Sequence, residues 1–295
     1  MSHRQVRVVD VFTEKPLTGN QLAVVLDGRD LSAWTMQRIA HEMNLPETTF
    51  VFPPDNPAHA AKVRIFTPQL ELPFAGHPTI GTAWVLMDEG LVKGLEFTLE
   101  ERVGPVPVRG VRENGRVIFW MTHPGVSFGQ VFPHRQVAET IGVDQDAILH
   151  DVPAQIATTG NPFVFLALRD HAAVDSGVPD PERVRKLVGG RAHGVFLFAA
   201  NGGNRLYSRM FAEDVLEDPV TGSASGPLGA FAVRYGLIER APKVSIVSEQ
   251  GTKMGRRGFA RIELEYGESD EIPHRIEVGG GVMPVLSGAL SDFAE

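Results

Sequence analysis

Three ionisable side chains stand beside glycine- or proline-containing turns in this 295-residue sequence, and their types suit proton transfer. Glu47 enters a β-branched and aromatic run, His77 follows an Ala-Gly pair, and Asp218 precedes Pro219 in an acidic turn. Carboxylates and imidazoles are the side chains that most often act as general acids and bases. Each also has a structural interpretation, because Glu47 suits a solvated strand edge, His77 a helix start and Asp218 a turn cap.

Cysteine is absent, and this narrows the chemistry further. Without cysteine there are no disulfides, thiolate nucleophiles, cysteine-ligated zinc sites or iron–sulfur clusters. Any reaction must therefore use oxygen and nitrogen groups. The acids Glu213, Asp214, Glu217 and Asp218 have no paired histidine at ligand spacing, so we interpret them as a solvated loop and expect no metal.

Small residues open two apolar helix-like runs. Gly76 precedes the first run, and Thr221, Gly222 and Ser223 precede the second. Small residues leave the backbone N–H groups of a helix start accessible, where the helix dipole favours an anion. We expect a small ligand with a carboxylate. Phosphate is the alternative, but the second segment lacks the Gly-Lys-Ser/Thr ending of a P-loop.

The two runs are copies of one pattern. Gly76 and Gly222 are 146 positions apart, and so are Gly90 and Gly236, which end the two runs. A repeat of this length is too long for a solenoid and indicates two related halves. We expect the active site where the halves face each other.

The polar groups of the two halves are not repeated. At this spacing the aligned pairs are Glu47 with His193, His77 with Ser223, and Leu72 with Asp218. The two halves therefore share a backbone pattern but carry different polar side chains at the aligned positions.

The surrounding pattern predicts an α+β protein whose halves are each β-rich, with one central and one outer helix. Predicted strands cover residues 6–12, 22–26, 47–52, 62–66, 95–100, 106–111 and 116–120, then 163–168, 195–199, 243–248, 259–266, 275–278 and 282–286. Outer helices are expected from an N-cap at Ser32 and from Asp180. We place one lobe at 1–122, joined by 282–295, and the other at 123–281.

Composition limits the classes of partner. Hydrophobic residues make up 43% and charged residues 22% of the chain, which is ordinary for a globular protein. The net charge of -8, with no basic block, argues against nucleic acid and anionic membranes. No apolar run reaches about 18 residues and no signal peptide is present, so a cytoplasmic location is expected.

Three blocks together, at residues 43–51, 72–83 and 209–224, resemble the phenazine-biosynthesis PhzF family. The likeness runs from the first strand, through Gly19 and Asn20, to Gln250 and Gly251, so it covers nearly the whole chain. The family resembles diaminopimelate epimerase in fold. This implies two pseudo-symmetric lobes, each a β-barrel-like, antiparallel-rich sheet wrapped around a central helix, and a homodimer.

The resemblance also implies an activity. It is an isomerase without cofactor or metal, whose type member moves a proton in trans-2,3-dihydro-3-hydroxyanthranilate. Carried over by residue, Glu47 matches the catalytic acid/base, and His77 and Asp218 match residues lining the site. The binding residues that the resemblance implies are Asn20, Gly76, Thr221, Gly222 and Ser223.

Two departures bear on the substrate. Pro46 stands where the phenazine enzyme has serine, and Gln21 stands where proline is common. The epimerase relatives use two cysteines, where this chain has Ala75 and Thr221, so thiol-based racemisation is excluded.

Two alternatives remain beside the isomerase. A homologue that only binds a metabolite would keep the small residues at the two helix starts without needing Glu47. A racemase would need a second acid or base opposite Glu47, and His193 is the candidate from the repeat. We also expect lobe closure over the substrate, with hinges near residues 122–125 and 279–281.

Overall fold

The computed structural model describes residues 4–178, 180–212 and 216–291 and divides the chain into two compact units. Unit 1 comprises Met1–Thr122 and Gly279–Glu295, and unit 2 comprises His123–Val278. The α-helices are α1 (Ala33–Met43), α2 (Gly76–Asp88), α3 (His134–Ile141), α4 (His171–Ser176), α5 (Pro181–Val188) and α6 (Gly222–Arg234), and a 3₁₀ turn covers Gln145–Ala147.

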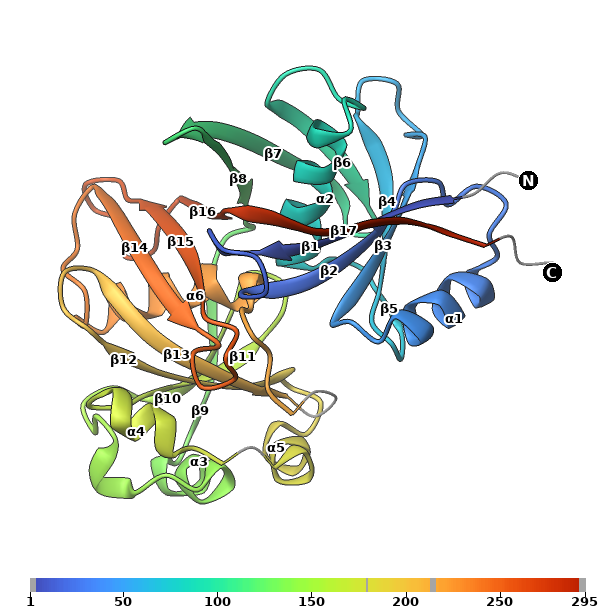
Figure 1. The fold of residues 1–295 in the computed structure, drawn as a ribbon. Coiled ribbons are helices and arrows are strands. Elements are labelled where there is room, and N and C mark those ends of the chain that lie inside the picture. The colour runs from blue at the N-terminus through green and yellow to red at the C-terminus, as the bar shows by residue number, and fades with distance from the viewer. Residues whose placement is uncertain (1–3, 179, 213–215, 292–295) are drawn as a thin grey trace. The chain divides into compact units, whose positions relative to one another are not determined.

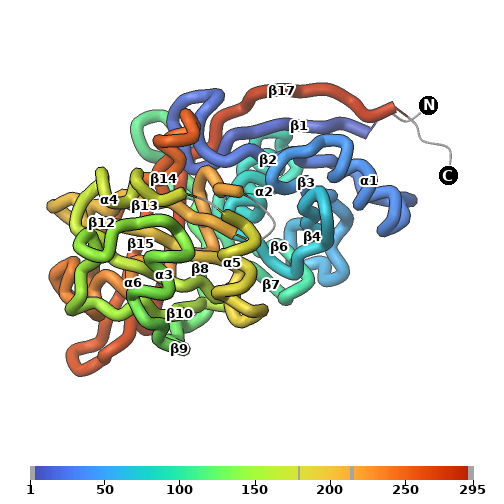
Figure 2. The backbone as a smooth tube through the Cα atoms, turned by 90° about the horizontal axis from the view of Figure 1, so that it is seen from below, coloured from blue at the N-terminus to red at the C-terminus, as the bar shows by residue number. Residues whose placement is uncertain are grey.

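The strands of unit 1 form a mainly antiparallel sheet (Figure 1). They are β1 (Arg4–Val11), β2 (Asn20–Val25), β3 (Glu47–Phe52), β4 (Ala61–Phe66), β5 (Glu71–Leu72), β6 (Glu96–Glu101), β7 (Gly104–Glu113), β8 (Arg116–Thr122) and β17 (Val282–Leu290). Hydrogen-bonded neighbours run in the order β17, β1, β2, β3, β4, β6, β7, β8. Only the β2–β3 and β4–β6 pairs in this order are parallel. Figure 2 shows β17 alongside β1.

Unit 2 repeats this order of pairing. Its strands are β9 (Ser127–Phe132), β10 (Ala154–Thr158), β11 (Phe163–Ala167), β12 (Gly194–Ala200), β13 (Arg205–Ala212), β14 (Lys243–Gln250) and β15 (Gly258–Glu265), and β16 covers Arg275–Gly280. Neighbours run from β9 to β15 in numerical order, and the β11–β12 and β13–β14 pairs are parallel. The parallel pairs thus fall at the same places as in unit 1, which confirms the α+β fold of two related halves.

Each unit wraps its sheet around one buried helix. The helix α2 contacts β1, β2 and β3 near one end of its sheet and β8 at the other, and α6 contacts both β10 and β15. Glycine allows the close approach of helix and strand. A Cβ atom at Gly81 would lie 2.5 Å from Leu22, and one at Gly229 would lie 2.8 Å from Ile262. The apolar runs of the two helices follow from this burial on most sides.

The helix ends confirm most of the predicted caps. Ser32 accepts a hydrogen bond from Thr35 N, and Asp180 accepts one from Arg183 N, as N-cap side chains do. The helix α2 begins at Gly76, so Pro78 is its third residue. Proline fits this position because the N–H groups of the whole first turn lack an intrahelical partner.

Candidate functional site

Glu47 and His77 meet in unit 1. Glu47 is the first residue of β3, where it pairs with Leu22 of the parallel strand β2, and His77 is the second residue of α2. His77 Nε2 lies 3.1 Å from Glu47 Oε2 and 3.2 Å from the carbonyl oxygen of Gln21. The side chains of His77 and Glu47 are only 5% and 16% exposed. The fold therefore brings together two residues that are 30 positions apart in the sequence.

The hydrogens of this contact can be assigned from its geometry. Both neighbours of His77 Nε2 are acceptors, so this nitrogen carries a proton. The aligned hydrogen bond goes to the Gln21 carbonyl, whereas the contact with Glu47 has the distance of an ion pair without hydrogen-bond alignment. Glu47 Oε2 is buried and makes no hydrogen bond to any residue that the structure describes. A carboxylate oxygen in this position is able to accept and return a proton.

Asn20 and Gly76 support this pair from neighbouring positions. Asn20 is the first residue of β2 and is completely buried. Gly19 precedes it with a φ of 70°, and a Cβ there would lie 2.3 Å from the carbonyl oxygen of Val11. Glycine is thus required at this turn, which sets the register that presents Gln21 to His77. Gly76 begins α2 after Ala75, which offers no side chain to cap the first turn.

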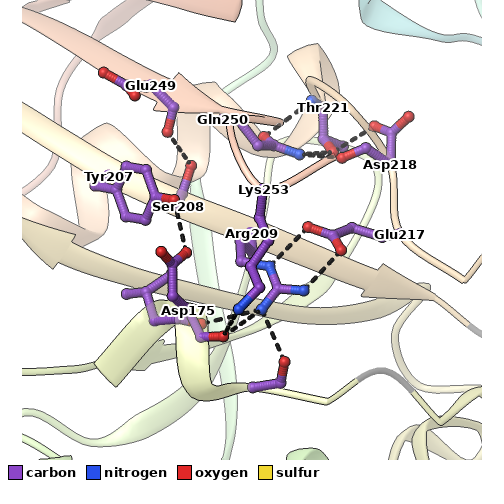
Figure 3. Close-up of polar contacts among 12 residues, drawn as sticks. Asp175, Tyr207, Ser208, Arg209, Glu217, Asp218, Thr221, Glu249, Gln250 and Lys253 are labelled. Atoms are coloured by element: carbon purple, nitrogen blue, oxygen red, sulfur yellow. Dashed lines mark hydrogen bonds and ion pairs between the residues drawn. The ribbon is translucent and has the colours of Figure 1, made fainter. Parts of the chain in front are cut away.

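Asp218, Thr221 and Gln250 form a second polar cluster, which lies in unit 2 (Figure 3). The hydroxyl of Thr221 donates to Asp218 Oδ2 at 2.5 Å. Gln250 Nε2 donates to the Asp218 carbonyl at 2.8 Å and to Thr221 Oγ1 at 3.0 Å, while Gln250 Oε1 accepts from Thr221 N. The three residues therefore hold one another in a fixed arrangement at the start of α6.

Gln250 was missed as a functional residue by the sequence analysis, although its Gln-Gly pair was noted. It is almost completely buried at the end of β14. Gly251 follows it with a φ of 76°, and a Cβ there would lie within 2.6 Å of two backbone oxygens. The glycine after a strand was the available signal. Its consequence, a contact with Thr221, depends on tertiary structure.

The first turn of α6 presents open backbone donors. Thr221 is the N-cap, but its side chain makes no capping hydrogen bond because the hydroxyl is directed to Asp218. Within the described chain, the N–H groups of Gly222 and Ser223 have no hydrogen-bond partner. Two free N–H groups at a helix N-terminus suit an anion such as a carboxylate.

Matching ion pairs fix the turn before each central helix. Arg209 makes two hydrogen bonds of 2.7 Å to Glu217, and Arg64 makes two of the same length to Glu71. Figure 3 shows Arg209 between Glu217 and the backbone around Asp175. The hydrogen bonds from Arg64 lower the pKa of Glu71. Arg64 and Arg209, like Glu71 and Glu217, are also 145 or 146 positions apart in the sequence.

The other candidates from the sequence are His193 and the acids Glu213 and Asp214. His193 is exposed, and its ring lies 5.9 Å from that of Phe163. Glu213 and Asp214 lie outside the described residues. Within residues 4–178, 180–212 and 216–291, no group of three or more His, Asp or Glu side chains could hold a metal ion. No helix in these ranges is long and apolar enough to cross a membrane.

Comparison with known proteins extends this picture. The family model described as "Phenazine biosynthesis-like protein" (PhzC-PhzF) matches residues 9–288. The chain is 38% identical over 288 residues to trans-2,3-dihydro-3-hydroxyanthranilate isomerase of Pseudomonas chlororaphis, covering 96% of this chain and 98% of that one.

Solved structures agree in fold. The Bacillus anthracis phenazine biosynthesis protein of the PhzF family matches with a TM-score of 0.89 and 26% identity, covering 99% of this chain and all of that one. A probable proline racemase from Agrobacterium radiobacter K84 matches with a TM-score of 0.67 and 11% identity, covering 98% and 93%, which shows a shared fold alone. The chain is an isomerase and belongs to the phenazine biosynthesis-like PhzC-PhzF family.

Proposed function

We propose that this isomerase moves a proton between two carbons of a small carboxylate-bearing substrate of the trans-2,3-dihydro-3-hydroxyanthranilate type, with Glu47 as the acid/base. One observation carries the proposal. Glu47 Oε2 is buried beside His77 and makes no hydrogen bond to the described residues. The name of the Pseudomonas chlororaphis relative supports the substrate class.

The proposed reaction needs only one group that exchanges a proton. Glu47 as the carboxylate takes a proton from a carbon of the substrate, and the electrons of the broken C–H bond shift the double bond. The protonated Glu47 then returns its proton to the far carbon of the original double bond, to which the displaced electrons have moved. Atoms and charge balance without a co-reactant, and general acid–base catalysis of this kind contributes about 10²–10⁴-fold.

The other residues have binding and orienting roles in this proposal. The hydrogen bond from His77 Nε2–H to the Gln21 carbonyl holds the ring beside Glu47, where the N–H group offers positive polarity to the carboxylate. The open N–H groups of Gly222 and Ser223 receive the substrate carboxylate, and Asp218 is held by Thr221 for contact with the substrate amine or hydroxyl. The Gln21 carbonyl, next to Asn20 on β2, orients His77.

Conversion of trans-2,3-dihydro-3-hydroxyanthranilate by the purified protein tests the proposal, with NMR following the ring protons in H₂O and D₂O. We expect a shifted double bond and one product. Binding without conversion would favour the metabolite-binding alternative. Exchange of the α-proton of amino acids in D₂O, without a double-bond shift, would favour the racemase.

We further propose that the protein is a homodimer. The family resemblance supports this, as does the exposed strand β17, on which Val285 and Leu286 are 40% and 54% exposed. Sedimentation equilibrium should give twice the chain mass of 32.1 kDa. A single species at the chain mass over micromolar concentrations would contradict the proposal.

A further inference from the structure

Glu101 is a buried acid in unit 1 that the proposed reaction does not use. It is the last residue of β6, and its carboxyl group faces Thr79, the fourth residue of α2. The distance between Glu101 Oε1 and Thr79 Oγ1 is 2.5 Å. Glu101 Oε2 is buried and makes no hydrogen bond to the described residues. The contact connects the sheet to the first turn of the helix that carries His77.

Counting hydrogens indicates which form of Glu101 fits. Thr79 Oγ1 lies 2.7 Å from the carbonyl oxygen of Ala75 as well as 2.5 Å from Glu101. A hydroxyl has one hydrogen, and a carbonyl oxygen only accepts. If Glu101 were ionised, one of the two contacts would have no hydrogen. If Glu101 is protonated, it donates to Thr79, and Thr79 donates to Ala75, so both contacts are satisfied.

The surroundings of Glu101 agree with an uncharged carboxyl group. Burial raises its pKa to about 8, against a smaller lowering by the Thr79 hydrogen bond. No neighbouring charge contributes to this shift. The charged groups on β6 itself and on the neighbouring elements α2, β4 and β7 have partners other than Glu101. These pairs are His77 with Glu47, Lys62 with Asp55, Arg64 with Glu71, Glu100 with His59, and Arg109 with the ring of Trp120. Arg102, the next residue, acts on Glu71.

Unit 2 has a neutral side chain at the same place in its fold. Gln250 ends β14, the strand that follows the central helix α6, as Glu101 ends β6 after α2. Its amide binds Thr221, the N-cap of α6. The two halves thus share one arrangement, in which a side chain at the end of the strand after the central helix contacts the start of that helix. In unit 2 this side chain cannot ionise.

We propose that Glu101, in its uncharged form, is a positioning residue that fixes the first turn of α2 through Thr79 and thereby holds His77 beside Glu47. The effect on the reaction rests on the proposed roles of His77 and Glu47, whereas the protonation of Glu101 does not. Ionisation of Glu101 would draw the Thr79 hydrogen away from Ala75 and loosen the turn on which Gly76 and His77 lie.

Glu101→Gln tests the proposal because it supplies a neutral donor of similar size that cannot titrate. We expect wild-type kcat to fall as pH rises through about 8, and we expect Glu101→Gln to keep wild-type kcat at pH 7 without that fall. Glu96→Gln, on the exposed start of the same strand, is the control and should titrate like wild type. The same alkaline fall in Glu101→Gln would overturn the proposal.

A second variant tests the connection through Thr79. Thr79→Val keeps the shape and removes the hydroxyl, so it should lower kcat by about tenfold with little change in KM, while Thr79→Ser should restore the rate. Wild-type kcat in folded Thr79→Val would overturn the positioning role.

Infrared difference spectra give a readout that does not need turnover. Wild type minus Glu101→Gln at pH 7 should show the carbonyl stretch of a protonated carboxylic acid, which disappears above the pKa. A carboxylate band in its place at pH 7 would overturn the proposal even if the enzyme is fully active. If the substrate is not converted but the acid band is present, the proposed reaction fails and the uncharged Glu101 stands.

Discussion

At the scale of single residues, Glu47 and Glu101 of unit 1 have carboxyl groups in different surroundings. Glu47 lies 3.1 Å from an imidazole and keeps part of its side chain exposed, whereas the buried Glu101 faces a hydroxyl. A buried carboxyl group without a neighbouring cation, such as that of Glu101, is favoured in its neutral form. We therefore propose proton transfer for Glu47 and hydrogen bonding for Glu101, although both residues are glutamates.

The raised pKa of Glu101 predicts how stability depends on pH. Its pKa is about 8 in the folded protein and 4.5 ordinarily, so between these values the folded state holds a proton that the unfolded state has lost. The contribution of Glu101 to stability is complete below about pH 4.5 and is lost as pH rises through about 8. The free energy of unfolding of wild type should fall relative to that of Glu101→Gln by at most about 1.4 kcal/mol per pH unit.

Urea unfolding at intervals from pH 5 to 9 measures this difference. Subtracting the two curves removes the other titrating groups, which both proteins share. Parallel curves over the whole range would show that Glu101 titrates alike in the folded and unfolded states.

At the scale of elements, the twin Arg–Glu pairs allow a matched comparison. The side chains of Arg209 and Glu217 are 4% and 10% exposed, while those of Arg64 and Glu71 are 28% and 20% exposed. Removing one partner of a buried pair typically costs about 3–5 kcal/mol, and exposed pairs contribute about 0–1 kcal/mol. Glu217→Gln should therefore destabilise the protein by about 3 kcal/mol, and Glu71→Gln by clearly less.

Denaturant unfolding of both variants checks this ordering. Each variant is the control for the other, because the pairs have the same bidentate geometry and differ in exposure. Equal losses, or a larger loss for Glu71→Gln, would contradict the argument from burial.

The first turn of α6 leads to a prediction about the ligand. Gly222 has no positive φ, so a side chain there is not excluded by backbone conformation. A valine at this position would obstruct the approach of an anion to the N–H groups of Gly222 and Ser223. Gly222→Val should weaken binding of anthranilate by about tenfold or more, which is about 1.4 kcal/mol.

Calorimetry with anthranilate and with its carboxamide checks the prediction, since the amide keeps the ring and removes the charge. Wild type should prefer the carboxylate, and Gly222→Val should lose that preference. If wild type binds both compounds equally, no anion is held at this helix start.

At the scale of the whole molecule, the duplication was the feature most readily predicted from sequence. The apolar runs after Gly76 and Gly222 predicted both central helices, and Ser32 and Asp180 marked two outer ones, because caps and helical periodicity are local signals. The segments β9, β10, α3 and α4 were missed. The two helices among them have six and eight residues, too short for a clear apolar period, and tertiary packing stabilises them instead.

The candidate site was only partly predictable from the sequence. Resemblance marked Glu47, His77 and Asp218, and the structure shows Glu47 beside His77 and Asp218 bound to Thr221. The contacts of Gln250 and Glu101 join residues 29 and 22 positions apart, which no local pattern encodes. Lobe closure around residues 122–125 and 279–281 stays a prediction.

The central claim is that Glu47 carries the proton. Glu47→Gln keeps the size of the side chain but cannot exchange a proton, so the measurement is its kcat for trans-2,3-dihydro-3-hydroxyanthranilate beside that of the exposed control Glu42→Gln. Glu47→Gln should lose about 10²–10⁴-fold in kcat with ligand affinity nearly unchanged, and Glu42→Gln should match wild type. Wild-type turnover by purified Glu47→Gln would contradict the assignment.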